Sequence, residues 1–449
     1  MGTVDAVAVV DTRLTAAEVL AFASRIQQAI DLADAAAGID LISALETVKS
    51  ACAAVQATAT DAVATAIATT RREAGLPKAQ WHKGIASQIG LARRESPNKG
   101  GRFLGLAQSL VHEMPHTHQR LLAGELNEWR VTLLARETAC LTVEDRREID
   151  KRLCQDVGTL KGLGDKAIEA KARALAAELD PASVVKKRAK AFSQRRTSTR
   201  PQPDFMCQFT TLTSMDRAVA MWATLKRDAD SMVGVGEETR TRDQIMADLA
   251  YQRITGAASA KAGAQVTVNL VISDDSLLSN GGNPAHLAGY GDIPAPIARH
   301  LVREASEADS TVELRRVYAA PGTGALTAME SKSRRFPTAL ARLIDIRDRT
   351  CRTPWCDAPI RHHDHIRAHA RGGETSADNG AGLCAACNHA KEAEGWSSAP
   401  RPTKYGVVHV YDFETPTGHQ YSSEAPPMPV VKHYVSFIEH DIHIDLRAA

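Results

Sequence analysis

The chain has 449 residues, of which 44% are hydrophobic and 24% charged, and its formal net charge is +2. This composition is ordinary for a soluble protein, and the length leaves room for roughly two to four domains with ample cores. The near-neutral charge excludes a uniformly basic surface, so any affinity for nucleic acid must come from local patches.

Four of the eight cysteines are scattered singly along the chain: Cys52, Cys140, Cys154 and Cys207. Scattered cysteines suit a reducing cytoplasm better than a disulfide-bonded secreted fold. The sequence shows no signal-peptide pattern at its start and no apolar run that we judge long enough to span a membrane. We therefore expect a cytoplasmic protein without a membrane partner.

Helical patterns dominate the first part of the chain. Residues 1–14 are expected to form a disordered leader, and Thr15 to Glu18 form a capping box that predicts a helix start. An apolar seam with gaps of four and three follows: Leu41, Leu45, Val48, Cys52, Val55 and Ala59. The seam predicts packing against a neighbouring helix, with an oligomer interface as the alternative. Because alanine is plentiful and aromatics are sparse, we expect a closely packed α-helical domain over residues 15–262.

Residues 115–137 allow two interpretations. Two short helices separated by Gly124 form either a helix-turn-helix that enters a DNA major groove or an ordinary bend within the helical domain. In the first case polar contacts would come from His116, His118, Arg120 and Arg130. We favour the bend, because glycine between helices is common.

The clearest charge run lies at residues 186–200. Its seven basic residues occur without an intervening acid: Lys186, Lys187, Arg188, Lys190, Arg195, Arg196 and Arg200. Such a run either neutralises DNA phosphates without regard to sequence or forms a solvated linker. Both interpretations stay open here, and residues 186–203 are expected to be linker-like.

The pattern changes from about residue 265. Apolar residues alternate from Val266 to Ile272, which predicts a half-buried strand, and the stretches around Pro321 to Gly324 predict a hairpin. We expect a mixed α/β region over residues 263–336 that bridges two larger domains. A helix is predicted over residues 337–349, and a hairpin across residues 415–418 is expected within a C-terminal segment over residues 401–449.

Two cysteine pairs mark the C-terminal region. Cys351 and Cys356 have a C-x4-C spacing, and Cys384 and Cys387 have a C-x2-C spacing. Two close pairs of thiolates are what a closed tetrahedral zinc site needs. Because so short a segment cannot bury much of a core, we predict a structural zinc ion that compensates.

The residues between the cysteine pairs predict a second, catalytic centre. Asp364 offers hard oxygen ligands suited to Mg²⁺ or Mn²⁺, and the adjacent His365 can take a proton from water near neutral pH. Asn379 follows fourteen residues after His365, and Asn388 nine residues later. Residues 331–405 contain thirteen Lys/Arg against eight Asp/Glu, and this local excess fits a polyanionic substrate.

The order Asp-His, Gly-Gly, Asn and Cys-x-x-Cys-Asn-x-x-Lys, over about residues 345–397, resembles the HNH endonuclease domain, whose fold is the ββα-metal fold. The resemblance implies that His365 is the general base and that Asp364 binds the catalytic cation. It also implies that Asn379 holds the loop and orients this histidine. Family members often have proline three residues after the catalytic histidine, where this chain has Ala368.

The same resemblance assigns the second cation ligand to Asn388 at the start of a helix, with His389 as a possible substitute. The whole chain, over roughly residues 15–425, is similar to actinobacterial proteins with a long helical domain of unknown function before a C-terminal HNH domain. The matching phrases begin at Ala92, Ala135, Leu287, Cys351 and Ala386.

We therefore expect a mainly α-helical multidomain protein with a zinc-stapled ββα-metal HNH domain at residues 337–400. The expected function is hydrolysis of phosphodiester bonds in DNA, most simply double-stranded DNA, with structural Zn²⁺ and catalytic Mg²⁺ or Mn²⁺. Lys391 and Arg367 are expected to contact substrate phosphate. The alternative is a non-catalytic zinc-stapled nucleic-acid-binding protein, which would have no need of Asp364, His365 and Asn388 together.

Overall fold

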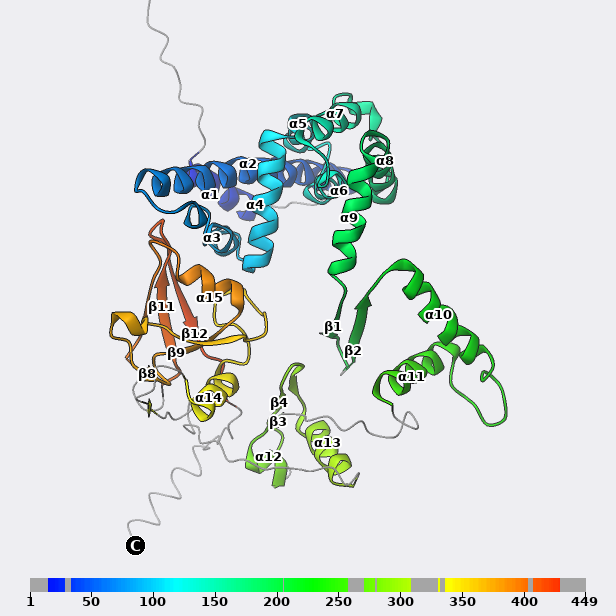
Figure 1. Ribbon diagram of the computed structural model, residues 1–449, viewed down its shortest axis with the longest axis vertical. Helices are drawn as coiled ribbons and strands as arrows, with labels where there is room; N and C mark the ends of the chain where they lie inside the picture. The colour runs from blue at the N-terminus through cyan, green and yellow to red at the C-terminus, as the bar shows by residue number, and fades with distance from the viewer. Residues whose placement is uncertain are drawn as a thin grey trace, which may run out of the picture.

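The computed structural model describes residues 15–28, 34–204, 206–256, 270–278, 281–307, 330–331, 336–402 and 407–428. Over these residues the protein is mainly helical, with small sheets (Figure 1). The predicted fold class is therefore confirmed. The expected leader and the tail from residue 430 lie outside the described residues.

The first part of the chain forms a domain of helices joined by short connections. Its elements are α1 (Ala16–Gln28), α2 (Ala35–Glu73), η1 (Lys78–Gln80), α3 (Ile85–Ala92), α4 (Pro97–His112), α5 (Pro115–Leu122), α6 (Glu128–Thr138), α7 (Val143–Cys154), η2 (Val157–Thr159), α8 (Asp165–Leu179) and α9 (Pro181–Ser193). Local sequence sets several helix starts. The side chains of Ser96, Asn127 and Thr142 accept hydrogen bonds from first-turn N–H groups of α4, α6 and α7. The predicted capping box of Thr15 and Glu18 is present before α1.

The apolar core of this domain is shared by α2 and the helices from α4 to α8. Its large buried side chains include Leu110, Met114, Leu121, Val131, Leu134, Ile149 and Ile168. The long helix α2 contributes small residues to this core: Ala53, Ala54 and Ala57. Alanine lets the backbones of α4 and α5 approach α2 closely.

The predicted seam is not the face of α2 that packs within the chain, and its alternative as an oligomer interface stays a prediction. Leu41 is 38% exposed and Val55 is 57% exposed, whereas Ala54 is fully buried. Both faces repeat at helical spacing, so the spacing alone cannot choose between them. The closely packed alanine face is the one that contacts α4 and α5, because the bulkier residues would hold the helices apart.

Helix α2 is also long and apolar enough, by length and composition, to cross a membrane, which corrects the expectation that no such segment exists. Length and composition alone are weak evidence for a membrane span, because core helices of soluble proteins can be equally long and apolar. Here α2 packs along one face against α4 and α5, and the helix also carries the buried polar residues Asp61 and Arg71.

Residues 115–137 form a bend inside the helical domain, as we favoured. Thr117 on α5 and Val131 on α6 are fully buried in that domain. The carboxylate of Asp150 on α7 accepts hydrogen bonds from backbone N–H groups of the first turn of α5 at 2.7 and 2.8 Å. Both helices are thus committed to internal packing, which leaves the helix-turn-helix interpretation without support.

The basic segment at residues 186–203 is not an irregular linker. Its first part lies on α9, and the rest contains β1 (Arg196–Pro201), which pairs antiparallel with β2 (Cys207–Leu212). Two further helices follow, α10 (Met215–Asp230) and α11 (Arg242–Thr255). They pack together around Ala229, Ile245 and Met246.

The bridging region is a small antiparallel sheet with two helices. It contains β3 (Leu270–Val271), α12 (Asp274–Leu278), β4 (Ala285–Leu287), β5 (Gly291–Ile293) and α13 (Ala295–Glu307), with strand order β3-β4-β5. Most of the predicted strand before Ile272 lies outside the described residues, as does the predicted hairpin around Pro321 to Gly324.

The C-terminal domain combines short strands with two helices. Its elements are β6 (Glu330–Ser331), α14 (Thr338–Asp348), β7 (His362–His365), η3 (His369–Arg371), β8 (Thr375–Ser376), β9 (Gly380–Leu383), α15 (Ala385–Lys391), β10 (Ser397–Pro400), β11 (Val410–Glu414) and β12 (Gln420–Glu424). Strand β7 pairs antiparallel with β9, β6 pairs with β8, and a separate sheet has the order β10-β11-β12. The predicted helix before the first cysteine pair and the predicted hairpin across residues 415–418 are both confirmed.

The C-terminal hairpin belongs to this domain rather than to a separate segment after residue 400. Strand β11 pairs with β10, and its side chains Tyr411 and Phe413 share one buried core with Cys351 and Trp396. The expected boundary at residue 400 was drawn where the cysteine motif ends. The sheet extends the domain because the motif alone offers too little apolar surface to bury.

A buried carboxylate locks the start of the domain to its end. Burial by itself would raise the pKa of Asp348, but the adjacent guanidinium of Arg347 and that of Arg352 lower it overall. Asp348 accepts hydrogen bonds from Arg347 at 2.6 Å and from Arg352 at 2.8 Å, and Arg352 also donates to the carbonyl of Ser423 at 2.8 Å. This network joins α14 to the C-terminal hairpin.

Candidate nuclease centre and zinc site

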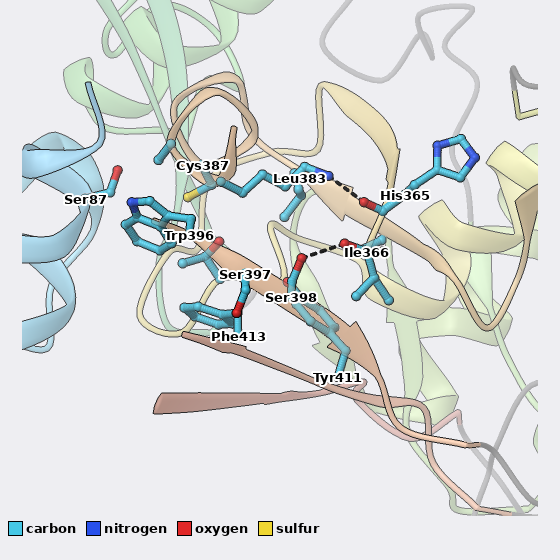
Figure 2. Close-up of a pocket in the computed structure, with 14 residues that line it drawn as sticks. Ser87, His365, Ile366, Leu383, Cys387, Trp396, Ser397, Ser398, Tyr411 and Phe413 are labelled. Atoms are coloured by element: carbon cyan, nitrogen blue, oxygen red, sulfur yellow. Dashed lines mark hydrogen bonds between the residues drawn. The ribbon is translucent and has the colours of Figure 1, made fainter. Parts of the chain in front are cut away.

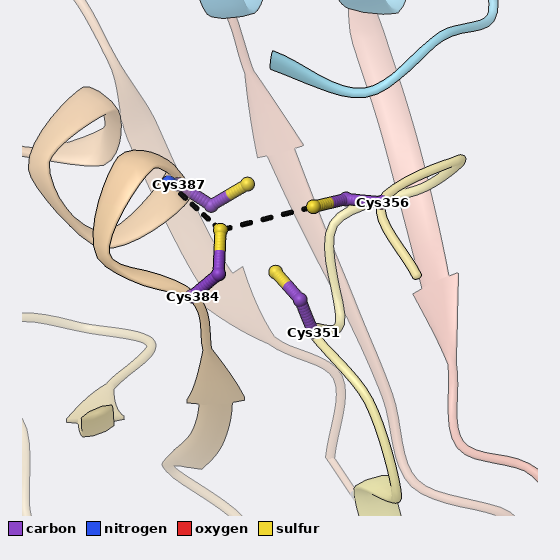
Figure 3. A group of neighbouring side chains, drawn as sticks. All are labelled: Cys351, Cys356, Cys384 and Cys387. Atoms are coloured by element: carbon purple, nitrogen blue, oxygen red, sulfur yellow. Dashed lines mark hydrogen bonds between the residues drawn. The ribbon is translucent and has the colours of Figure 1, made fainter. Parts of the chain in front are cut away.

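The four predicted zinc ligands come together in the structure. Cys351 and Cys356 lie on the loop after α14, Cys384 is the N-cap residue of α15, and Cys387 lies in its first turn. All four are buried, and their sulfur atoms lie within 4.8 Å of one another (Figure 3). The Sγ atoms of Cys356 and Cys384 are 3.7 Å apart. A tetrahedral zinc site with Zn–S bonds near 2.3 Å places its sulfurs roughly 3.8 Å apart, so the group fits zinc.

The crowding of four thiols also favours a bound cation. Hydrogen bonds from the other cysteines lower the pKa of Cys384, and contact with the same groups raises the pKa of Cys387. One thiolate therefore makes the next one harder to form. A Zn²⁺ ion removes this conflict because it holds all four sulfurs as thiolates.

The predicted base, His365, lies at the end of β7 with its ring fixed on several sides. Its Nε2 atom is 2.9 Å from Oγ1 of Thr375 on β8. Its ring contacts Phe336 at a centroid distance of 4.7 Å and His369 at 5.5 Å. The residue is 7% exposed, so its orientation is set by the fold rather than by solvent.

The predicted cation ligand, Asp364, is adjacent to His365 and more accessible, with 30% of its side chain exposed. Its Oδ1 atom accepts a hydrogen bond from the backbone N–H of His365 at 2.9 Å and lies 3.8 Å from Nδ1 of the same histidine. Its Oδ2 atom lies 2.7 Å from Nζ of Lys391 on α15. The end of β7 thus places a carboxylate and an imidazole close to each other.

Helix α15, which carries the second predicted ligand, packs against β7. Asn388 and Lys391 are three residues apart and therefore lie next to each other on one face of α15. The Oδ1 atom of Asn388 is buried without a hydrogen-bond partner. A buried carbonyl oxygen left without a donor is costly in a folded protein, and a cation would satisfy it. His389, the possible substitute, is exposed and its ring lies 6.2 Å from the ring of His362.

Asn379 ties the loop between β7 and β9 together. Its Oδ1 atom accepts a hydrogen bond from the backbone N–H of Arg367 at 2.8 Å, and its Nδ2 atom donates to the carbonyls of Arg367 and Glu374 at 3.0 and 2.8 Å. These bonds fix both ends of the loop segment from Arg367 to Glu374. These contacts are of the kind that the expected loop-holding role requires.

The residues predicted to contact DNA are spread over separate parts of the structure. The side chain of Arg367 is exposed, and Lys391 is engaged with Asp364 and with the carbonyl of His365, to which it donates at 2.5 Å. The basic residues at 186–190 lie on α9. Figure 1 shows α9 and β1 apart from α15, so the basic run is not part of the centre itself.

A small apolar cavity lies behind the centre, between α15 and the β10-β11-β12 sheet (Figure 2). Trp396, Tyr411 and Phe413 line it together with Leu383. The backbone carbonyl of His365 accepts a hydrogen bond from the side chain of Lys391, and Figure 2 shows the hydrogen bond from Ser398 to the carbonyl of Ile366. Most of the lining residues belong to the C-terminal domain, and Ser87 of α3 in the helical domain also lines the cavity.

Sequence reasoning missed the contact between the helical domain and α15. Gly84, the residue before α3, has a φ of +79°, and a Cβ atom there would lie 3.0 Å from Cβ of Ala393 and 3.0 Å from Nε1 of Trp396. Leu91 on α3 is buried in the same apolar cluster as Trp396. Figure 1 shows α3 beside α15. No motif marks this contact, because the two segments are about three hundred residues apart.

Polar side chains of the helical domain also reach the chain directly after α15. Lys83 donates from Nζ to the carbonyl of Glu392 at 3.2 Å, and the buried Arg71 donates from Nη2 to the carbonyl of Glu394 at 3.1 Å. Gln88 donates to Oγ1 of Thr417 in the C-terminal hairpin at 2.7 Å. Cations at the carboxyl end of a helix are favourable for its dipole, so these contacts stabilise α15.

Comparisons with known families agree with this architecture. The family model described as HNH endonuclease matches residues 351–394, the segment that holds the four cysteines, Asp364, His365 and Asn388. The C-terminal part of the protein is therefore an HNH endonuclease domain. The family model described as domain of unknown function, DUF222, matches residues 46–348.

This second match covers more than half of the 449 residues, and the chain belongs to the DUF222 family. The expected combination of an N-terminal domain of unknown function with a C-terminal HNH domain is thus confirmed. Neither curated proteins nor solved structures give a significant match.

Proposed function

We propose that the protein is a metal-dependent endonuclease that hydrolyses phosphodiester bonds in DNA, with His365 as the general base. The observation that carries this proposal is the meeting of β7 and α15. Strand β7 carries Asp364 and the fixed imidazole of His365 next to each other. Helix α15, which packs against β7, carries Asn388, whose buried Oδ1 atom has no hydrogen-bond partner. A protein that merely binds nucleic acid has no need of this set.

Asp364 and Asn388 would hold the divalent cation. A carboxylate and an amide carbonyl are both hard oxygen donors of the kind that Mg²⁺ and Mn²⁺ prefer. Asp364 is the accessible member, and Asn388 supplies an oxygen that the protein leaves without a donor. When bound, such a cation stabilises the charge that develops on the phosphate and on the leaving 3′ oxygen.

The orientation of His365 suits proton abstraction from water. In the tautomer whose Nε2–H donates to Oγ1 of Thr375, the Nδ1 atom keeps its lone pair and is the basic nitrogen. This Nδ1 atom lies 3.8 Å from Oδ1 of Asp364, so the base lies beside the carboxylate that would hold the cation. Attack of the resulting hydroxide in line with the 3′ oxygen would leave a 5′ phosphate on the product.

A second candidate is a non-catalytic zinc-stapled nucleic-acid-binding protein. The observation that favours it is the ion pair of Lys391 with Asp364, which neutralises the carboxylate that the catalytic cation would need. In that case the protein would bind DNA without any dependence on Mg²⁺ or Mn²⁺ and would leave it intact. The two candidates therefore differ in one direct experiment.

That experiment is a nicking assay on supercoiled plasmid with zinc-loaded full-length protein in Mg²⁺, in Mn²⁺ or without either cation. Conversion to open-circular or linear DNA that requires the cation and is abolished in His365→Ala supports the nuclease. His363→Ala is the matched control, because His363 is a neighbouring histidine that pairs with Asp345 on the surface. Tight binding without cleavage under every condition would favour the second candidate and overturn the first.

A further inference from the structure

The hairpin of β1 and β2 is an antiparallel ribbon whose residues are all exposed. Arg196 pairs with Leu212 at one end and Pro201 pairs with Cys207 at the other. Every residue of both strands is exposed among the parts of the chain that the structure describes. An isolated two-stranded hairpin is at best marginally stable in water. Both faces of this ribbon are therefore accessible to a partner.

The pleat divides the ribbon into two chemically different faces. Alternate residues of a strand point to opposite faces, and directly paired residues share a face. One face accordingly carries Arg196, Ser198, Arg200, Gln208, Thr210 and Leu212. The other carries Thr197, Thr199, Pro201, Cys207, Phe209 and Thr211. We call the first set the arginine face. Its two charges are both positive, and neither strand contains an acidic residue.

Further positive charge lies at the base of the ribbon. The guanidinium of Arg195 lies 3.6 Å from the ring centre of Phe192, and that of Arg217 on α10 lies 5.5 Å from the same ring. This aromatic ring holds two cations beside the start of β1. The sequence places four more basic residues on the preceding helix α9, between residues 186 and 190.

We propose that the arginine face enters the major groove of double-stranded DNA and reads base edges there, separately from the nuclease centre. The major groove, about 12 Å wide, admits a two-stranded ribbon. Six residues at about 3.3 Å each give a ribbon roughly 20 Å long, enough to follow about six base pairs. The inference rests on the proposed function only in taking DNA as the partner.

The residues on the arginine face match the chemistry of that groove. Arginine binds the O6 and N7 atoms of guanine with two hydrogen bonds, and glutamine does the same with adenine. Arg196 and Arg200 thus offer the ribbon two guanine contacts, and Gln208 offers one adenine contact. The hydroxyls of Ser198 and Thr210 lie between them on the same face. The basic residues at the base of the ribbon would contact phosphates and set its position without reading sequence.

The test is selection of bound duplexes from a random DNA library by full-length, zinc-loaded protein carrying His365→Ala, so that DNA is bound without being cut. Arg196→Ala combined with Arg200→Ala should lose the enriched sequence and weaken binding to it by about 10- to 100-fold. The slope of log affinity against log salt should change little, because these arginines contact base edges while the phosphate contacts come from the base of the ribbon. Gln208→Ala should relax the preference at one position and leave the salt slope unchanged.

The matched control is Thr197→Ala with Thr199→Ala, which changes the opposite face of the same strand. It should retain the enriched sequence and the salt slope. The inference is overturned if the arginine variant binds like the parent, if the control variant loses as much affinity, or if the parent enriches no sequence. It is also overturned if sedimentation shows that the arginine face pairs with a second copy of the chain.

These outcomes are separate from those of the nuclease proposal. Plasmid cleavage by the wild-type protein with an arginine variant that binds normally would remove the ribbon inference and keep the nuclease. Sequence-selective binding through the ribbon without any cleavage would keep the ribbon inference and overturn the nuclease proposal. Circular dichroism and zinc content of each variant show that a loss of binding is not a loss of folding.

Discussion

The ammonium group of Lys391 lies 2.7 Å from Oδ2 of Asp364 and 2.5 Å from the carbonyl oxygen of His365. The positive charge of Lys391 on α15 thus pairs with the carboxylate of Asp364, which the proposed catalytic cation needs. The side chain of Lys391 is long and flexible, so it can give way to a divalent ion. The same amine is then free to contact a phosphate of the substrate.

We expect Lys391→Met to bind Mn²⁺ more tightly than the parent, by up to roughly tenfold, because a competing cation is removed from Asp364. Isothermal titration of zinc-loaded protein with Mn²⁺ measures this, and Lys391→Arg is the control that keeps the charge. Weaker Mn²⁺ binding in Lys391→Met would show that the amine supports the cation site rather than competing with it.

The alanine variants of the centre should fail in different ways. His365→Ala removes the base and should cleave plasmid about 10²–10⁴-fold more slowly while binding metal and DNA normally. A higher pH should restore part of the rate, because hydroxide replaces the missing base. Asp364→Ala and Asn388→Ala should both need much more Mg²⁺ to reach their residual rates. The measurements are nicking rates as a function of pH and of Mg²⁺ concentration.

His389→Ala tests the assignment at the helix start. It should cleave like the parent, because the buried oxygen without a partner belongs to Asn388. If His389→Ala shows the metal-dependent defect and Asn388→Ala does not, the cation ligand is His389. If all of these variants cleave at the parent rate, the activity lies elsewhere in the chain.

Removal of zinc should loosen the C-terminal domain and spare the helical one. Each of Cys351, Cys356, Cys384 and Cys387 replaced by serine should release one zinc ion per chain, since the site needs all four thiolates. Cys52→Ser is the control, because this cysteine is exposed and outside the cluster. Elemental analysis measures zinc, and hydrogen exchange locates the loosened segments. Protein purified without chelator that contains no zinc would contradict the site.

Gly84 offers a direct test of the contact between the helical domain and α15. Gly84→Ala places a methyl group 3.0 Å from Ala393 and Trp396, which should destabilise the contact by about 1–3 kcal/mol. Gly75→Ala is the matched control, because its φ of +77° is similar but no atom lies within 4 Å of the added Cβ. Faster hydrogen exchange in α15 is expected for Gly84→Ala alone. If the two variants increase hydrogen exchange equally, the loss of stability comes from backbone strain and not from the contact with α15.

The buried imidazole of His409 should make the C-terminal domain sensitive to acid. Burial, with help from the guanidinium groups of Arg347 and Arg352, lowers the pKa of His409 from 6.5 to about 3. The unfolded chain therefore takes up a proton at a higher pH than the folded one does. Stability from this group is complete above about pH 6.5 and is lost as the pH falls toward about 3, at up to about 1.4 kcal/mol per pH unit.

Urea unfolding between pH 7 and pH 4.5 measures this dependence. His409→Gln should unfold more readily at pH 7 but lose less of its stability on acidification, because no imidazole remains to be protonated. Replacement of the exposed His82 by Gln should leave the parent's pH dependence unchanged. Zinc release at low pH affects all three proteins alike, so the difference between them isolates His409.

The sequence by itself determined the parts of this protein that depend on residues close together in the chain. The capping box at Thr15, the helix before Cys351 and the cysteine spacings are local patterns, and the structure confirms each of them. The members of each cysteine pair are close because one loop carries Cys351 and Cys356 and the start of α15 carries Cys384 and Cys387. Asp364 and His365 are adjacent in sequence, so any fold that holds β7 holds them together.

Tertiary structure decided what local patterns leave open. The apolar seam of Leu41 and Val55 and the alanine face of α2 have the same helical period, and close packing of α4 and α5 selected the alanines. The basic run at residues 186–200 lies on helix α9 and strand β1. The pleat of β1 places Arg196 and Arg200 on the same face of the ribbon. The contact of Gly84 with Ala393 depends on shape across two domains, which no spacing along the chain encodes.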